Sequence, residues 1–278
     1  MSSFIKNLEE TINRKESLIC VGLDPDPNQM QVHDLLEFCK RIIEEVVPYV
    51  AAIKPNLAFF EAFGLEGITT LERVVAFAKE VAPEVILIGD AKRGDISSSM
   101  EKYAKAMFEA WDFDAATVNP FAGRDSIEPF LQYKDKGVLV WCKSSNPDGS
   151  QFQNIGDDDK SGLGSVYKTI AREANKWNFN QNVGLVVGAT YPNELEAVRQ
   201  ISPDLPILVP GIGSQHGDLY ASVVGGISKS KYNLLISSSR NIIYSSGNSV
   251  DYGTSAGTAA MRLRNRVNEV LVKIGRSL

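Results

Sequence analysis

The charged residues of segment 90–95, Asp-Ala-Lys-Arg-Gly-Asp, follow the apolar run Val-Ile-Leu-Ile. Because side chains alternate along a strand, Asp90 and Lys92 are predicted to share one face of it. Lys54, at the end of an earlier apolar run, can join them from a neighbouring strand. A lysine held among carboxylates can deliver a proton or stabilise a carbanion, which predicts a reaction centre here. The alternative is a structural ion-pair network, since buried charges occur in compensating sets.

Eight short apolar runs predict the strands that position these residues. The runs are rich in Val, Ile and Leu, which is typical of parallel strands covered on both faces. The runs span residues 18–24, 51–56, 85–92, 114–119, 137–143, 183–189, 206–211 and 233–240. Helical spacing of apolar residues follows each run, at 31–47, 71–81, 97–111, 126–134, 163–177, 193–201, 216–224 and 255–274. A further helix is expected at 4–13, before the first run.

This alternation of eight strands and eight helices predicts a (β/α)8 barrel of the TIM type with an extra N-terminal helix. No linker divides the chain, so residues 1–278 are interpreted as a single catalytic domain. The alternative is a doubly wound open sheet. Such a sheet usually has fewer strands, and no Gly-x-Gly-x-x-Gly motif follows the first strand here.

Composition argues against several kinds of partner. The net charge of −5 gives no global footprint for nucleic acid or acidic membranes. No apolar run is long enough to span a membrane, and the first residues lack a signal-peptide pattern. The three cysteines lack metal-ligand spacing and are interpreted as reduced, buried thiols. We therefore expect a cytoplasmic protein.

The C-terminal ends of barrel strands supply catalytic groups, so the polar residues there are candidates. They are Asp24, Lys54, Asn56, Asp90, Lys92, Asn119, Lys143, Ser144, Ser145, Thr190 and Arg240. The polar stretch 144–160 is interpreted as an active-site loop, with a solvated insertion as the alternative. A second loop, rich in Gly and Ser, is expected at 245–257. His33 and His216 lack partners for a triad or a metal site, and His216 is expected to begin a helix.

Arg240 is a candidate for binding phosphate rather than for catalysis, because loops after the seventh and eighth strands of such barrels often bind phosphate. Arginine offers a planar fork of donors to phosphate oxygens. Gly211 and Gly213 let backbone amides approach, and Gln215 can add a side-chain donor. The alternative is an ordinary turn beside a surface arginine.

Taken together, these segments resemble the orotidine 5′-phosphate decarboxylase family over essentially the whole chain. The family motif Asp-x-Lys-x-x-Asp, followed by an aliphatic residue, is matched at 90–96. Further matches, in the family's order, are Val-Gly-Leu-Asp at 21–24, Ile-Lys-Pro-Asn at 53–56, Lys-Ser-Ser-Asn-Pro at 143–147, Val-Gly-Ala-Thr at 187–190, Pro-Gly-Ile at 210–212 and Ser-Arg-Asn-Ile at 239–242. The segments at 143–147 and 187–190 are similar to the longer bacterial-type branch.

The resemblance implies a lyase that converts orotidine 5′-monophosphate to UMP and carbon dioxide in pyrimidine biosynthesis, without a metal or cofactor. Lys92 would protonate C6 of the pyrimidine, and Asp90 would sit against the substrate carboxylate. Lys54 and Asp24 would hold ribose hydroxyls and the charge network. Asp95 would be donated to the active site of a second subunit, which implies a homodimer.

The resemblance also implies a set of substrate contacts. Ser145 would contact the pyrimidine edge. Gln215 and Arg240, with the amides of Ser239 and Arg240, would bind the 5′-phosphate. This chain departs from many family members in having serines, rather than glycine, before Arg240.

Three rival interpretations remain at this point. Hexulose-phosphate synthases are similar in fold and share the Asp-x-Lys-x-x-Asp motif, but they use Mg²⁺. A non-catalytic barrel would bind UMP-like ligands without turnover. A purely structural barrel is disfavoured by the charges at the strand ends.

Overall fold

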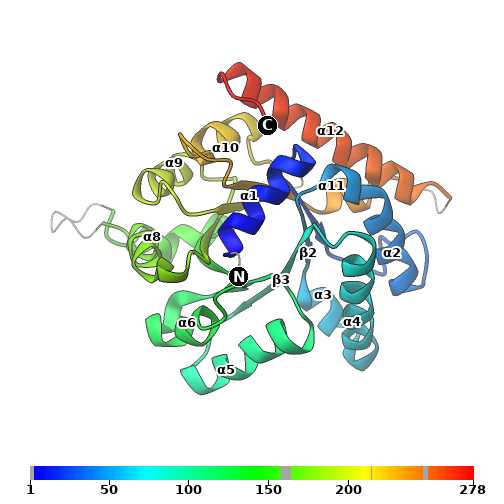
Figure 1. The fold of residues 1–278 in the computed structure, drawn as a ribbon, viewed down its shortest axis with the longest axis horizontal. Coiled ribbons are helices and arrows are strands. Elements are labelled where there is room, and N and C mark those ends of the chain that lie inside the picture. Colours follow the sequence, from blue (N-terminus) through cyan, green and yellow to red (C-terminus); the bar gives the residue numbers. More distant parts are fainter. Residues whose placement is uncertain (1–2, 158–163, 214, 247–249) are drawn as a thin grey trace.

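Eight parallel strands close into a barrel in chain order, with each strand hydrogen-bonded to the next (Figure 1). The computed structural model describes residues 3–157, 164–213, 215–246 and 250–278. The strands are β1 (Ile19–Leu23), β2 (Ala52–Pro55), β3 (Ile86–Arg93), β4 (Ala115–Val118), β5 (Gly137–Lys143), β6 (Val183–Val187), β7 (Ile207–Pro210) and β8 (Leu234–Ser238). Because β8 pairs with β1, through Ile236 and Ile19 among others, the open-sheet alternative is excluded.

Helices surround the barrel on its outer face (Figure 1). Those that follow strands or complete the outer layer are α2 (Leu35–Val46), α3 (Leu57–Glu61), α4 (Gly64–Val81), α5 (Ser97–Lys105), α6 (Arg124–Leu131), α7 (Ser150–Gln153), α8 (Val166–Trp177), α9 (Pro192–Ile201), α10 (Leu219–Gly226), α11 (Arg240–Ile243) and α12 (Tyr252–Lys273). The predicted (β/α)8 barrel is therefore confirmed. None of the described helices is long and apolar enough to cross a membrane.

The extra N-terminal helix, α1 (Phe4–Lys15), is also confirmed. It lies across the barrel in Figure 1, and its Phe4 ring packs where a side chain on Gly137 would otherwise stand. Gly137 begins β5, so α1 covers the N-terminal end of the barrel. The strands finish at the opposite end, which is the end where barrel enzymes of this type carry their catalytic groups.

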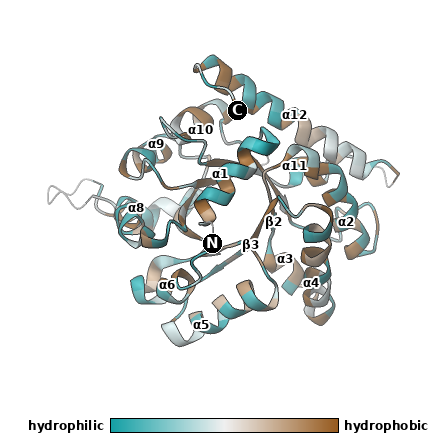
Figure 2. Ribbon diagram, in the orientation of Figure 1, coloured by the Kyte–Doolittle hydropathy of each residue, from teal (hydrophilic) through white to brown (hydrophobic). Residues whose placement is uncertain are grey.

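The apolar runs form strands that are buried on both faces, by the barrel interior on one side and by the surrounding helices on the other. Every residue of β1, β2, β4, β6 and β8 is buried. Figure 2 shows hydrophobic strands at the centre and helices that mix hydrophobic and hydrophilic residues around them. The core therefore lies inside the barrel and between the strands and the buried helix faces, as the sequence pattern predicts.

Several helix boundaries differ from the predictions; α2, for example, begins at Leu35 rather than at residue 31, and α4 begins at Gly64 rather than at residue 71. The expected helix at 97–111 is α5 followed by a π-helical turn at Ala106–Ala110. His216 does not begin a helix, so that prediction is wrong. Its φ is 61°, and α10 starts at Leu219 because the Asp218 side chain caps it by accepting a hydrogen bond from the Ala221 amide.

The loop predicted at 144–160 contains a short 3-10 turn, Pro147–Gly149, and the single-turn helix α7. Residues 158–160 of this loop, and residue 163 of the next predicted helix, lie outside the described residues. The second predicted loop, at 245–257, is shorter than expected, since α12 already begins at Tyr252. Residues 247–249 of that loop also lie outside the described residues.

Candidate active site

A buried charge network occupies the C-terminal ends of β2 and β3. Asp90 binds two lysines: its Oδ2 lies 2.5 Å from Lys54 Nζ, and its Oδ1 lies 2.6 Å from Lys92 Nζ. Asp90 is 7% exposed and Lys54 is 4% exposed, so water screens their interaction weakly. The prediction that Asp90 and Lys92 share a face, with Lys54 arriving from the adjacent strand, is confirmed.

The network keeps its members charged despite their burial. Burial alone would raise the pKa of Asp90, but the charges and hydrogen bonds of Lys54 and Lys92 lower it well below its usual range. Burial would likewise lower the pKa of Lys54, but the negative charges of Asp90 and Asp24 raise it above its usual range. The site therefore presents an ionised carboxylate between two lysines at neutral pH.

These residues face a cavity of about 220 Å³ at the end of the barrel. Eleven of the residues predicted from sequence line it: Asp24, Lys54, Asn56, Asp90, Lys92, Ser144, Ser145, Gly211, Gln215, Ser239 and Arg240. They come from strands and loops spread over the whole chain, so the closed barrel is what brings them together. Asp95 does not line the cavity, and neither do the strand-end candidates Asn119, Lys143 and Thr190. The Asp95 carboxylate accepts a hydrogen bond from the Ile96 amide at 2.7 Å.

Asp24 offers the cavity an unused acceptor. Its Oδ1 is buried and has no hydrogen-bond partner among the described residues. Its backbone oxygen accepts a hydrogen bond from the Tyr244 hydroxyl at 2.8 Å, and that hydroxyl accepts one from the Asp26 amide at 2.6 Å. Tyr244, which sequence reasoning missed, therefore holds the loop after β1 in place. An orphaned carboxylate oxygen of this kind suits a ligand hydroxyl.

The end of the cavity that contains Arg240 is formed by tight turns. Gly211 and Gly213 have φ values of 107° and 109°, which favour glycine over other residues. A side chain at Gly211 would also come within 2.7 Å of Gln215 Oε1. Arg240 begins α11 and follows Ser239 directly. An arginine, an amide side chain and a glycine turn therefore converge there, which is a suitable donor set for phosphate.

Lys143 is one of the strand-end candidates that do not line the cavity. Strand alternation would place it on the same face as Trp141, which does line the cavity. The register of β5 against β6 shifts between Trp141 and Lys143, and Lys143 turns away instead. Its Nζ donates to Asn154 Oδ1 at 2.7 Å and lies 4.3 Å from the Tyr191 ring centre, where burial lowers its pKa. Lys143 thus anchors the loop that begins with Ser144.

Two side chains at the centre of the site were not identified from the sequence. Trp141 was read as part of an apolar run, although its place near the strand end could have indicated the cavity. Thr117 of β4 is 1% exposed and donates a hydrogen bond to Asp90 Oδ1 at 2.8 Å. A single threonine inside an apolar strand was the available signal, since its hydroxyl needs a partner when it is buried.

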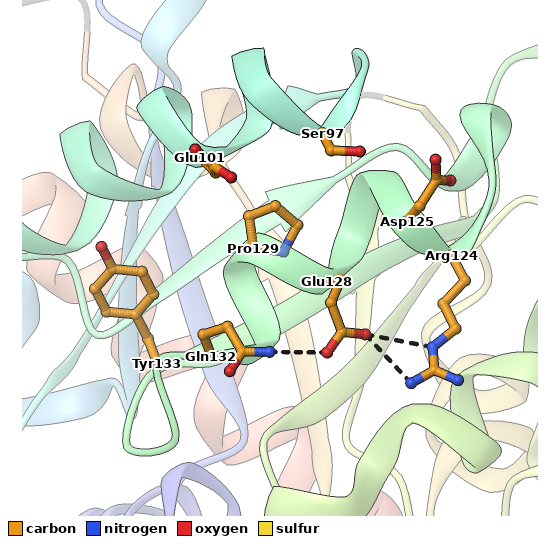
Figure 3. Close-up of a pocket in the computed structure, with 8 residues that line it drawn as sticks. All are labelled: Ser97, Glu101, Arg124, Asp125, Glu128, Pro129, Gln132 and Tyr133. Carbon is orange, nitrogen blue, oxygen red and sulfur yellow. Dashed lines mark hydrogen bonds and ion pairs between the residues drawn. The ribbon is translucent and has the colours of Figure 1, made fainter.

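A larger groove, of about 850 Å³, lies on the helical layer between α5 and α6 (Figure 3). It is lined by Ser97, Glu101, Arg124, Asp125, Glu128, Pro129, Gln132 and Tyr133. Figure 3 shows Glu128 engaged by both Arg124 and Gln132. The groove shares no residue with the barrel-end cavity, and it is more open. Its size therefore does not make it the reaction site.

The cysteines are buried free thiols, as predicted. Burial raises the pKa of Cys20 and of Cys142 to about 12, and it also raises the pKa of Cys39. They are protonated at neutral pH and are therefore poor nucleophiles. Over the described part of the chain, no three His, Cys, Asp or Glu side chains group as metal ligands would.

Fold and site together define a class: a (β/α)8-barrel protein with a Lys–Asp–Lys network and a glycine turn beside an arginine at the C-terminal end of the barrel strands. Residues 17–252 match the family model described as orotidine 5′-phosphate decarboxylase / HUMPS family. The chain belongs to this family.

Curated relatives and solved structures agree. Orotidine 5′-phosphate decarboxylase of Dehalococcoides mccartyi is 41% identical over 266 residues, covering 95% of this chain and 97% of that protein. The enzyme of the same name from Aromatoleum aromaticum is 42% identical over 272 residues, covering 95% and 98%. The structure of Leishmania donovani OMP decarboxylase has a TM-score of 0.84 at 38% identity, covering 97% of this chain and 99% of that one. The sequence prediction of an enzyme of this decarboxylase family is confirmed.

Proposed function

We propose that the protein decarboxylates orotidine 5′-monophosphate to UMP and carbon dioxide, the last step of UMP biosynthesis, with Lys92 protonating C6. The observation that carries the proposal is the Lys54–Asp90–Lys92 network that lines the cavity, in a chain about 41% identical to decarboxylases of this name. The network supplies a positive charge and a proton at one position.

The reaction leaves an electron pair on a ring carbon when the bond from C6 to the carboxylate breaks. Lys92 Nζ, whose side chain is 35% exposed toward the cavity end, then gives its proton to C6. Its positive charge favours the developing carbanion over the substrate. Asp90 opposes the substrate carboxylate and holds Lys92 at 2.6 Å. Typical enzymatic accelerations need roughly 8–23 kcal/mol, so several groups must contribute.

The remaining predicted residues would bind the nucleotide. The unpartnered Asp24 Oδ1 accepts a ribose hydroxyl, and Lys54 serves the same region. Ser145 contacts the pyrimidine edge. Gln215, Ser239 and Arg240 bind the 5′-phosphate far from the reacting carbon, where binding energy can order the surrounding loops.

Asp95 would act in the site of a second copy of the chain, in a homodimer. It does not line its own cavity, and the residues beside it expose apolar surface: Ile96 is 67% exposed and Phe121 is 95% exposed. Gly94 abuts Asn119, so the loops after β3 and β4 present these side chains on adjoining parts of the surface. Exposed large apolar side chains around a charged residue favour a protein interface.

The test is ultraviolet monitoring of orotidine 5′-monophosphate with the purified protein and EDTA. We expect substrate absorbance to be lost at the same rate with and without the chelator. Activity abolished by EDTA and restored by Mg²⁺ would favour chemistry like that of the hexulose-phosphate synthases. UMP binding without turnover would favour the non-catalytic barrel. A cytoplasmic location remains a prediction.

A further inference from the structure

The backbone of β3 is irregular where it carries the reactive lysine. Gly89 pairs with Ala116 and Arg93 pairs with Val118, so four steps along β3 match two steps along β4. Lys92 lies within this bulge and has a φ of 45°, a left-handed conformation that is costly for a residue with a side chain. Such a conformation persists only when surrounding contacts hold it.

Thr117 stands opposite the bulge and provides those contacts. Its hydroxyl oxygen accepts a hydrogen bond from the Lys92 amide at 2.9 Å, which takes the place of a ladder bond. The same hydroxyl donates to Asp90 Oδ1 at 2.8 Å. Asp90 Oδ1 also binds Lys92 Nζ at 2.6 Å, so the three residues form a closed ring of hydrogen bonds. One hydroxyl thus fixes both the main chain of Lys92 and the carboxylate that holds its ammonium group.

We propose that Thr117 is a positioning residue for the decarboxylation: its hydroxyl sets where the Lys92 ammonium group lies above the reacting carbon. The inference rests on the proposed role of Lys92 as the proton donor. Thr117 itself is not among the residues that line the cavity, so it acts through Lys92 and Asp90.

The matched pair of substitutions is Thr117→Val and Thr117→Ser. Valine keeps nearly the same volume but leaves the Lys92 amide and Asp90 Oδ1 each short of one partner. Serine keeps the hydroxyl. Because a displacement near 1 Å can cost about 100-fold in rate, we expect T117V to lower kcat roughly 10- to 100-fold. KM and UMP affinity should stay within about threefold, since the substrate contacts remain, and T117S should restore kcat to near the wild-type value.

Thr11→Val is the control. Thr11 is also buried, and its hydroxyl donates one hydrogen bond of 2.9 Å to the Glu84 carbonyl, but it lies in α1 at the opposite end of the barrel. T11V should lower thermal stability less than T117V, because it loses one hydrogen bond rather than two, and it should leave kcat unchanged. If Thr117 has only a structural role, T117V and T11V should each lose kcat only in proportion to their loss of thermal stability.

The inference is overturned if folded T117V has a kcat within twofold of wild type, or if T117S is as slow as T117V. If T117V does not fold, Thr117→Ala takes its place in the comparison with T117S, with the same criteria. The role of Lys92 fails separately: an active Lys92→Ala enzyme overturns the proton-donor assignment whatever Thr117 does.

Discussion

Replacing Asp90 with asparagine is expected to destabilise the folded protein at neutral pH, because it leaves two lysines beside a neutral side chain. Both Lys54 and Lys92 contact the Asp90 carboxyl group, and Lys54 is 4% exposed. Removing one partner of a buried ion pair costs about 3–5 kcal/mol. Lys92 is partly exposed and can be solvated, and Asp24 still faces Lys54, which favours the lower end, about 3 kcal/mol.

The pH dependence of this loss has a definite sign. In the wild type, the raised pKa of Lys54 gives stability that is complete below its usual pKa of 10.5 and is lost as pH rises through the folded value. The lowered pKa of Asp90 gives stability that is complete above its usual 3.8 and is lost as pH falls through the folded value. In D90N, burial would lower the pKa of Lys54, so the unfolded state binds more protons and stability rises with pH.

Thermal unfolding at pH 7 and at pH 9.5 measures both effects. At about 2–4 °C per kcal/mol, a loss of about 3 kcal/mol lowers Tm by roughly 6–12 °C at pH 7. The difference from wild type should shrink at pH 9.5. Asp112→Asn is the control, since Asp112 is 59% exposed in its ion pairs and should change stability by less than about 1 kcal/mol. A D90N protein as stable as wild type at pH 7, or a difference that widens with pH, would refute this reasoning.

Two further predictions concern the phosphate and the dimer. Arg240→Ala should raise KM for orotidine 5′-monophosphate about 10- to 100-fold, because charged hydrogen bonds are worth about 1.5–3 kcal/mol, while the exposed Arg73→Ala leaves KM unchanged. Steady-state kinetics check this, and an unchanged KM for R240A would contradict the phosphate assignment. Asp95→Ala and Lys92→Ala proteins, each inactive alone, should recover part of the activity when mixed, because one site of the heterodimer then has all its residues. Heterodimers that form without any recovery would argue against a shared site.

The sequence predicted the barrel because its strands carry the signal of two covered faces. β3, expected at 85–92, forms at Ile86–Arg93. Strand alternation predicted Asp90 beside Lys92, a contact that the structure makes within the bulge of β3, and the order of strands placed Lys54 beside them. These features depend on the spacing of apolar residues along each strand and on the closure of the barrel. The eight apolar runs are enough to predict both.

The remaining features depend on local departures from strand regularity, which no single-residue pattern encodes. Lys143 was grouped with the strand-end candidates, but the register shift after Trp141 turns it toward Asn154. Thr117 looked like one polar residue in a buried strand, and only the bulge of β3 brings the Lys92 amide to its hydroxyl. Bulges arise from pairing between distant segments, so they appear only once the strands are placed side by side.

The central claim, that Lys92 protonates C6, is tested most directly by the kcat of Lys92→Ala on orotidine 5′-monophosphate. General acid catalysis contributes about 10²- to 10⁴-fold, so we expect kcat to fall by at least about 100-fold, with a smaller loss in UMP affinity. Lys105→Ala, on the exposed surface of α5, should behave as wild type. A folded K92A enzyme with wild-type kcat would contradict the account.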